Sequence, residues 1–283
     1  MHTSDSLLDA TIPIAVLEPF RRVNGALLAL VKTFTADDWR RPTVHPNRDV
    51  KDLTAHLLHG TLRRLSFQRD AYNRPGPPPL TAHELIAWIQ QDNREFMAGM
   101  RGLSPRVLIE LLELNDPQLL AMFEGADPMA DALGVVWAGE WQSRAWFDIA
   151  REYTEKWHHQ QQLRDATGRP PLCERALLEP VLETFVRGLP FAYRHYDAAP
   201  GTRISVSIAG ETSQAWTLVR MQGGFALFCG ADSKAEAALS VPADVAWRLW
   251  TKGLSREDAM ASISCTGASS AIDPLLSFVA IMA

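Results

Sequence analysis

The hydrophobic pattern of the chain changes from a helical period to a strand period near residue 170, and this change limits the possible folds most. Before it, long amphipathic segments are separated by short breaks; after it, short runs rich in β-branched and aromatic residues follow one another. The chain has 283 residues, more than the roughly 100–200 that are usual for one domain. We therefore expect two domains, residues 1–170 and residues 171–283.

The first 170 residues are predicted to form helices almost throughout. Asp49 and Ser104 are expected N-cap residues, and Thr81 with Glu84 forms a capping box. Pro117 is expected to interrupt the fourth helix, because proline removes a backbone hydrogen bond. The predicted helices cover residues 12–34, 50–72, 81–100, 104 onward and 139–167.

Residues 171–283 are predicted to form a smaller α+β domain with a mainly antiparallel sheet. The glycines at positions 223 and 224 supply a hairpin turn between two of the strands. The predicted strands cover residues 202–210, 214–222, 225–232, 237–241 and 261–267. The predicted helices cover residues 174–193, 242–253 and 269–282.

The composition argues against several classes of partner. Hydrophobic residues make up 47% of the chain and charged residues 22%, and the net charge is −5. No basic stripe could follow a phosphate backbone, so we expect no nucleic-acid partner. The apolar runs are shorter than the ~18 residues of a membrane span, and the amino terminus lacks the pattern of a signal peptide. We expect a cytoplasmic protein, a monomer or homodimer, with no membrane partner.

The three cysteines suit neither a disulfide framework nor a structural zinc site. Cys173, Cys229 and Cys265 are far apart and form no CxxC motif. We expect them to be small buried hydrophobic residues in a reducing compartment.

The predicted helix 139–167 carries Glu155 and His159 four residues apart on its polar face. Trp146 and Trp157 lie on its apolar face and are expected in the core. Side chains at positions i and i+4 can hold one metal ion, and a third ligand from another helix would complete such a site. Exposed Glu and His at this spacing are common by chance, so periodicity alone favours a solvated helix face over a metal site.

Two segments, FTADDWRRPTVHPNRDVKDLTAHLLHG and AREYTEKWHHQQQLRDATG, carry a resemblance to a known family. They resemble the mycothiol-dependent maleylpyruvate isomerases, which are DinB-like metal-binding helical bundles. The first segment matches the family's Trp after a short acidic turn, at Trp39, and its Asp-x-x-x-His motif, at Asp52 and His56. The second matches the family's Glu-x-x-x-His motif, at Glu155 and His159.

The resemblance implies a DinB-like up-and-down bundle in which His56, Glu155 and His159 bind a divalent metal. Zinc is the expected ion, and nickel or another divalent ion is the alternative. The resemblance also implies that mycothiol, or another low-molecular-weight thiol, is the cosubstrate. Asp52 and Gln162 are candidates to orient the imidazoles, and stabilisation of the helix N-terminus is the alternative role of Asp52.

The chain departs from the family pattern at several places. The Gly-Trp pair before the second helix is replaced by the sequence PNRD. His158 and His59 lie near the implied ligands, so either could replace one of them. Residues 241–283 are similar to the family's sterol-carrier-like second domain, whose catalytic basic residue has several possible counterparts here. These candidates are Arg220, Arg248, Lys252 and Arg256.

The predicted function is that of a metal-dependent, thiol-dependent isomerase or S-transferase. Its substrates would be a small-molecule thiol and a small, maleylpyruvate-like electrophile. One alternative is a non-catalytic protein of the same fold that binds a metal or a small ligand. The other is a metal-dependent hydrolase of a small conjugate.

Overall fold

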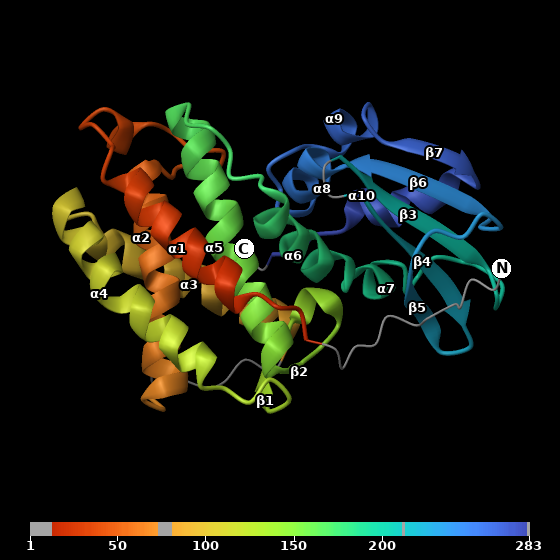
Figure 1. Cartoon of the computed structure of the whole chain (residues 1–283), viewed down its shortest axis with the longest axis horizontal. Helices are drawn as coiled ribbons and strands as arrows, with labels where there is room; N and C mark the ends of the chain where they lie inside the picture. The colour runs from red at the N-terminus through yellow and green to blue at the C-terminus, as the bar shows by residue number, and fades with distance from the viewer. Residues whose placement is uncertain (1–12, 73–80, 211–212, 282–283) are drawn as a thin grey trace. The chain divides into compact units, whose positions relative to one another are not determined.

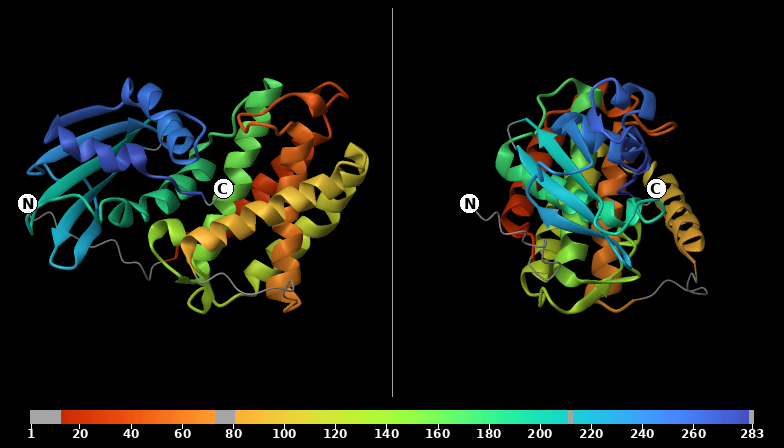
Figure 2. Two further views of the ribbon diagram at one scale, coloured as in Figure 1. Left: turned by 180° about the vertical axis from the view of Figure 1, so that it is seen from behind. Right: turned by 90° about the vertical axis from the view of Figure 1, so that its right-hand side faces the viewer.

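The chain folds into two units in the computed structural model, which describes residues 13–72, 81–210 and 213–281 (Figures 1 and 2). The helical unit comprises Ala15–Ala130 and Ile149–Cys173, and the α/β unit comprises Asp131–Asp148 and Glu174–Ile281. The predicted fold class is confirmed, since a helical region precedes a mainly antiparallel sheet. The signal-peptide expectation and the predicted start of the first helix concern residues 1–12, which lie outside the described ranges.

The ends of the helices in the helical unit are set by local signals. The helices are α1 (Leu17–Val31), η1 (Asp38–Arg40), α2 (Val50–Arg64), η2 (Leu65–Arg69), α3 (Ala82–Met100), α4 (Pro105–Glu124) and α5 (Ala145–Thr167). The Asp49 carboxylate caps α2 by accepting a hydrogen bond from the Asp52 N–H at 2.8 Å. Thr81 and Glu84 form the capping box of α3, and Ser104 caps α4, so all three predicted caps are confirmed. No helix in the described part of the chain is long and apolar enough to cross a membrane.

Helix α4 continues through Pro117, so the predicted interruption is wrong. Proline removes one hydrogen bond of the helix, but the preceding residue is held firmly by tertiary contacts. The Asp116 carboxylate is buried and accepts hydrogen bonds from Lys156 and from the Thr61 hydroxyl, both at 2.7 Å. We infer that these contacts offset the bond lost at the proline.

Two other predicted helices differ from those observed. Helix α5 begins later than predicted, because β1 (Asp131–Leu133) and β2 (Gln142–Arg144) form an antiparallel hairpin before it. The predicted helix 174–193 is divided at Gly188 into α6 (Arg175–Val186) and α7 (Leu189–Ala192). A Cβ atom at Gly188 would lie 2.6 Å from the ring of Phe278, so close packing requires glycine there.

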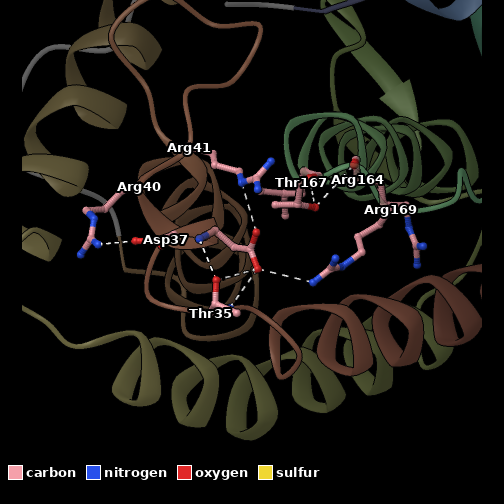
Figure 3. A network of polar contacts seen from close by, with 9 residues as sticks. Thr35, Asp37, Arg40, Arg41, Arg164, Thr167 and Arg169 are labelled. Carbon is pink, nitrogen blue, oxygen red and sulfur yellow. Dashed lines mark hydrogen bonds and ion pairs between the residues drawn. The ribbon is translucent and has the colours of Figure 1, made fainter.

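The buried carboxylate of Asp38 joins η1 to the residues that follow α5. Figure 3 shows its partners Thr35, Arg41 and Arg169. The carboxylate accepts hydrogen bonds from the N–H and the hydroxyl of Thr35, both at 3.0 Å. It also pairs with Arg41 at 3.2 Å and with Arg169 at 3.4 Å. The Thr35 N–H lowers the pKa of Asp38 more than burial raises it, and the two arginines lower it further. The neighbouring Trp39 is buried in an apolar cluster that includes Leu53 and Leu163.

The α/β unit is built on a five-stranded sheet of order β5-β4-β3-β6-β7. Only β3 and β6 run parallel; the other neighbouring strands are antiparallel. The strands are β3 (Arg203–Ala209), β4 (Gln214–Met221), β5 (Gly224–Cys229), β6 (Ala237–Pro242) and β7 (Ser264–Gly267). The helices besides α6 and α7 are α8 (Ala243–Trp250), α9 (Arg256–Met260) and α10 (Ile272–Ser277), with the short η3 (Val136–Ala138) and η4 (Ser269–Ala271).

The tryptophans predicted to be in the core are buried. Trp146 and Trp157 of α5, the two tryptophans expected there, are 5% and 0% exposed; Trp247 and Trp250 of α8 are also buried, at 1% and 0%. The cysteine prediction is wrong, because Cys229 is exposed and Cys173 and Cys265 are only half-buried. Cys229 shares a face of β5 with the buried Phe225 and Leu227, but it is the last residue of the strand and is exposed there.

Helix α5 is buried on nearly all sides, so the prediction that its polar face is solvated is wrong. Glu152, Lys156 and His159 are 4%, 1% and 4% exposed. Neighbouring helices supply partners for these charges. Lys156 donates a hydrogen bond to Asp116 of α4 at 2.7 Å, and Arg64 of α2 donates one to Glu152 at 3.0 Å. The helical period identifies the polar positions of α5 correctly but cannot tell a solvated face from one that is paired inside a bundle.

The Lys156→Met substitution should destabilise the protein by about 3–5 kcal/mol, because it leaves the buried Asp116 carboxylate without its cation. The free energy of unfolding can be measured by urea titration. The double variant Lys156→Met, Asp116→Leu should recover much of this loss, because it removes both charges. Arg106→Ala, which breaks a solvent-exposed pair with Glu110, is the control and should change the stability little. An equally small effect of Lys156→Met would contradict our account of α5.

Candidate metal centre

The three metal ligands implied by the sequence come together inside the helical unit. His56 of α2 and Glu155 and His159 of α5 each offer one ligand atom, and these atoms all lie within 4.8 Å of one another. Nε2 of His159 is 3.4 Å from Oε2 of Glu155. The rings of His56 and His159 meet edge to face, with their centroids 4.7 Å apart. The i and i+4 spacing places Glu155 and His159 over one turn of α5, and α2 adds His56 from a distant part of the sequence.

Gln162 contacts His159 on the ring edge opposite Glu155. Its Oε1 atom lies 2.8 Å from Nδ1 of His159 and 3.0 Å from Nε2 of His45. An amide oxygen only accepts hydrogen bonds, so each of these ring nitrogens carries a hydrogen. In the neutral His159 ring the lone pair is therefore on Nε2, which faces the Glu155 carboxylate. Two acceptor atoms that face each other in this way are suited to hold a cation between them.

Burial and neighbouring charges set the protonation of the other two residues. Burial lowers the pKa of His56 well below its usual value. Burial alone would raise the pKa of Glu155, but nearby positive charge, including that of Arg151, lowers it overall. At neutral pH the cluster therefore contains a neutral imidazole at His56 and an ionised carboxylate at Glu155, the forms that bind metal ions.

The two neighbouring histidines that could have replaced a ligand have other partners. His158 is buried, and its Nδ1 donates a hydrogen bond to the Thr154 carbonyl at 2.7 Å. His59 lies between Asn93 and Asp92 of α3, with its ring nitrogens 2.9 Å and 3.1 Å from their side-chain oxygens. Within the described ranges, the cluster of possible ligands includes neither of them.

Asp52 and Gln162, the predicted orienting residues, are placed differently. Gln162 contacts His159 directly, as described above. The carboxylate of Asp52 instead lies 3.6 Å from Nε of Arg101, the residue that follows α3. No hydrogen bond links Asp52 to an imidazole among the residues that the structure describes. Its position in the first turn of α2 fits stabilisation of the helix N-terminus.

The predicted catalytic cations of the α/β unit lie on separate elements. Arg220 is on β4, with its guanidinium 5.4 Å from the centre of an aromatic ring. Arg248 of α8 donates hydrogen bonds to both carboxylate oxygens of Asp244, at 3.1 Å and 3.0 Å. Lys252 follows α8 with a left-handed backbone, at φ 60°, and lines an open cavity of about 460 Å³. A catalytic role for any of the three stays a prediction.

The sequence analysis missed His45, which lies beside the cluster. Its half-buried ring is 3.0 Å from Gln162, 117 positions further along the chain, and its centroid is 5.6 Å from that of His159. His45 belongs to the irregular segment before α2, where no hydrophobic period indicates which side chains face the core. The only local signal is the turn-forming Pro46 and Asn47 next to it, which indicates a fixed loop but not its direction.

Comparison with known proteins identifies relatives of the whole arrangement. The model of the mycothiol maleylpyruvate isomerase N-terminal domain matches residues 20–164. The chain is similar to the crystal structure of the mycothiol-dependent maleylpyruvate isomerase, with 13% identity and a TM-score of 0.53, over 84% of this chain and 88% of that one. A histidine-to-alanine mutant of that enzyme matches with 12% identity and a TM-score of 0.53, over 90% and 93% of the chains. No curated protein matches the chain significantly.

The stability of the metal-free protein should fall as the pH decreases from 7 to 5. Burial lowers the pKa of His45 to about 4 and that of His158 to about 3, against 6.5 for an unperturbed histidine. Below about pH 6.5 the unfolded chain therefore binds more protons than the folded protein, so acid favours unfolding. We expect the free energy of unfolding from urea titration to be lower by about 2 kcal/mol or more at pH 5 than at pH 7.

His158→Gln is the matched variant for this measurement. Glutamine can still donate a hydrogen bond to the Thr154 carbonyl but does not titrate, so the pH dependence should become shallower. Equal stability of the wild-type protein at the two pH values would show that these rings bind protons in the folded state.

Proposed function

Because the chain belongs to the family of the mycothiol maleylpyruvate isomerase N-terminal domain, we propose that it is a metal-dependent enzyme whose cosubstrate is a low-molecular-weight thiol. Mycothiol is the first candidate for that thiol. Addition of the sulfur to an activated double bond, rotation about the resulting single bond and elimination of the thiol would convert a cis enoate into its trans isomer. Transfer of the thiol to a small electrophile is the related reaction that the same site could support.

The convergence of His56, Glu155 and His159 is the observation that carries this proposal. Two imidazoles and one carboxylate from two helices form a three-residue donor set of the kind found in catalytic zinc sites. The sequence resemblance implied the same three residues independently of the structure. Zinc fits these donors well, and nickel and other divalent ions accept the same ligand types.

The residues of the cluster fit a bound cation. The His56 ring makes no hydrogen bond with any residue in the described ranges, and its Nδ1 is buried. Nε2 of His159 and the Glu155 carboxylate face each other at 3.4 Å, and Gln162 occupies the other nitrogen of His159. A buried acceptor without a partner is costly, and a cation would satisfy all three residues at once.

The chain supports the proposed chemistry in two ways. Gln162 would fix the tautomer and the orientation of His159, as second-shell hydrogen bonds do for metal-binding histidines. The side chain of Glu155 is 23% exposed, so a small molecule can reach the cluster although His159 is buried. A divalent cation held there would lower the pKa of a coordinated thiol and so supply a thiolate at neutral pH.

Purified protein should contain about one divalent ion per chain by elemental analysis, by analogy with three-ligand catalytic sites. His56→Ala and His159→Ala should each lose the ion, because two remaining ligands bind a metal much more weakly. His158→Gln is the matched control, since His158 is the immediate neighbour of His159 but bonds to a backbone carbonyl. Full occupancy in both alanine variants would defeat the proposed site, and loss of the ion in the control would make His158 a ligand.

The metal-loaded protein should isomerise maleylpyruvate only when a thiol is present. We would compare mycothiol, glutathione and cysteine with a thiol-free reaction, following the cis substrate and the trans product separately. His56→Ala should lower the rate by about 100-fold or more, because thiolate formation would depend on the cation. A loaded protein that is inactive with every thiol would favour the binding-protein alternative. Cleavage of a thiol conjugate without added thiol would favour the hydrolase.

A further inference from the structure

The α/β unit contains a cavity between the C-terminal end of α8 and the segment that follows α10. Its volume is about 460 Å³, within the range of roughly 300–1,000 Å³ that is usual for small-molecule sites. The two walls are joined, because the Ala280 N–H donates a hydrogen bond to the Trp250 carbonyl at 2.8 Å. Phe278 also packs edge to face against Trp250, with the ring centroids 5.6 Å apart. The cavity is therefore a fixed feature of this unit.

The cavity has an apolar floor and a cationic mouth. The floor consists of Leu249, Leu276 and Phe278, which are 4%, 3% and 4% exposed. The mouth carries Lys252 and Arg256, which line the same cavity and are exposed. The lining residues in the described part of the chain include these two cations and no carboxylate. Such a division of apolar and charged groups suits a ligand with an apolar body and a negatively charged end.

The nearby carboxylates reduce the positive charge of the mouth only in part. Asp273 of α10 lies 3.8 Å from Arg256, in a pair that is open to solvent. Asp258 of α9 accepts a hydrogen bond from the hydroxyl of Ser255 at 2.7 Å. Neither carboxylate lines the cavity. With Arg256 shared between Asp273 and a ligand, the mouth suits a monoanion better than a dianion.

The backbone of Lys252 gives a second reason to assign a role to its side chain. The Gly253 N–H donates to the Arg248 carbonyl at 2.7 Å, and the Lys252 N–H donates to the Leu249 carbonyl at 3.2 Å. These two bonds form a Schellman motif, in which Lys252 takes the left-handed position, with φ 60°. Glycine is usual at that position because other residues are strained there, and here the glycine comes one residue later. A strained lysine beside a cavity indicates that its side chain is needed there.

We propose that this cavity binds a monocarboxylate with an apolar body, such as a medium-chain fatty acid. The apolar body lies on the floor of Leu249, Leu276 and Phe278, and the carboxylate pairs with Lys252 and Arg256 at the mouth. Charge-assisted hydrogen bonds to the carboxylate then fix the orientation of the ligand. The site is separate from the metal cluster, because none of the three proposed metal ligands lines it. The inference does not depend on the proposed function.

Binding of octanoate to the purified protein, measured by calorimetry, tests this site. Lys252→Gly should weaken octanoate binding by about tenfold or more, because it removes a charge-assisted contact. The same substitution should not lower the melting temperature, because glycine adopts the left-handed conformation without strain. Lys252→Arg keeps the charge and should retain most of the affinity. Arg256→Gln should weaken binding less than Lys252→Gly, since Arg256 is shared with Asp273.

Ala71→Gly is the matched control, because Ala71 also has a left-handed backbone, with φ 53°, but belongs to the helical unit. It should leave octanoate binding unchanged. Two further ligands separate the contributions of charge and apolar surface. Octanol has the chain without the charge, and acetate has the charge without the chain. Each should bind at least about tenfold more weakly than octanoate.

The His56→Ala variant distinguishes this site from the metal cluster. It should bind octanoate as tightly as the wild-type protein, because His56 is not part of the cavity. The proposal is overturned if octanoate does not bind, if Lys252→Gly binds it as tightly, if octanol binds equally well, or if His56→Ala loses the binding. The last result would place octanoate at the metal cluster. Octanoate binding in a protein that holds no metal would keep this site and reject only the proposed enzyme.

Discussion

The structure of the helical unit depends on one constraint, the burial of a helix that carries charged side chains. Helix α5 has almost no exposed face, so each polar group on it needs a partner from the surrounding helices. Glu152 accepts a hydrogen bond from Arg64 of α2, and Lys156 donates one to Asp116 of α4. Such pairs contribute little net stability compared with apolar packing, but a mismatch is strongly unfavourable. They therefore fix the rotation of α5 and its register against α2 and α4.

The proposed metal cluster follows from the same constraint. Glu155 and His159 continue the polar row of α5 by one turn, but the residue that meets them, His56, offers no countercharge when it is neutral. The Glu155 carboxylate and the imidazole lone pairs then face one another, and no protein donor lies between them in the described part of the chain. The bundle that pairs its other buried charges internally thus leaves one position where a cation is needed. The ion pairs on either side hold the three ligands in place without binding the metal themselves.

The sequence predicts the parts of this arrangement that depend on local chemistry. Asp49, Thr81 and Ser104 cap helices as expected, because a cap needs only a side chain near the first turn. Contacts between distant segments could not be predicted in this way. Pro117 stays inside a helix because of a lysine on another helix, and the polar face of α5 is buried because other helices supply its partners. His45 lies in an irregular turn whose direction is set by tertiary contacts, so no periodic signal could place it beside His159. The three ligands were accessible from the sequence through a family motif, whereas spacing alone favoured a solvated helix face.

The chemistry of the donor set explains why the cosubstrate would be an external thiol. Two neutral imidazoles and one carboxylate leave a divalent cation with one net positive charge, whereas every cysteine ligand would remove one more. This remaining charge is what favours a thiolate over a thiol. The cluster in the described part of the chain contains no cysteine, and Cys229, the exposed one, lies at the end of a strand in the other unit. Without a cysteine ligand, the bound cation would keep its net positive charge and an open coordination position. A thiol from solution could then occupy that position.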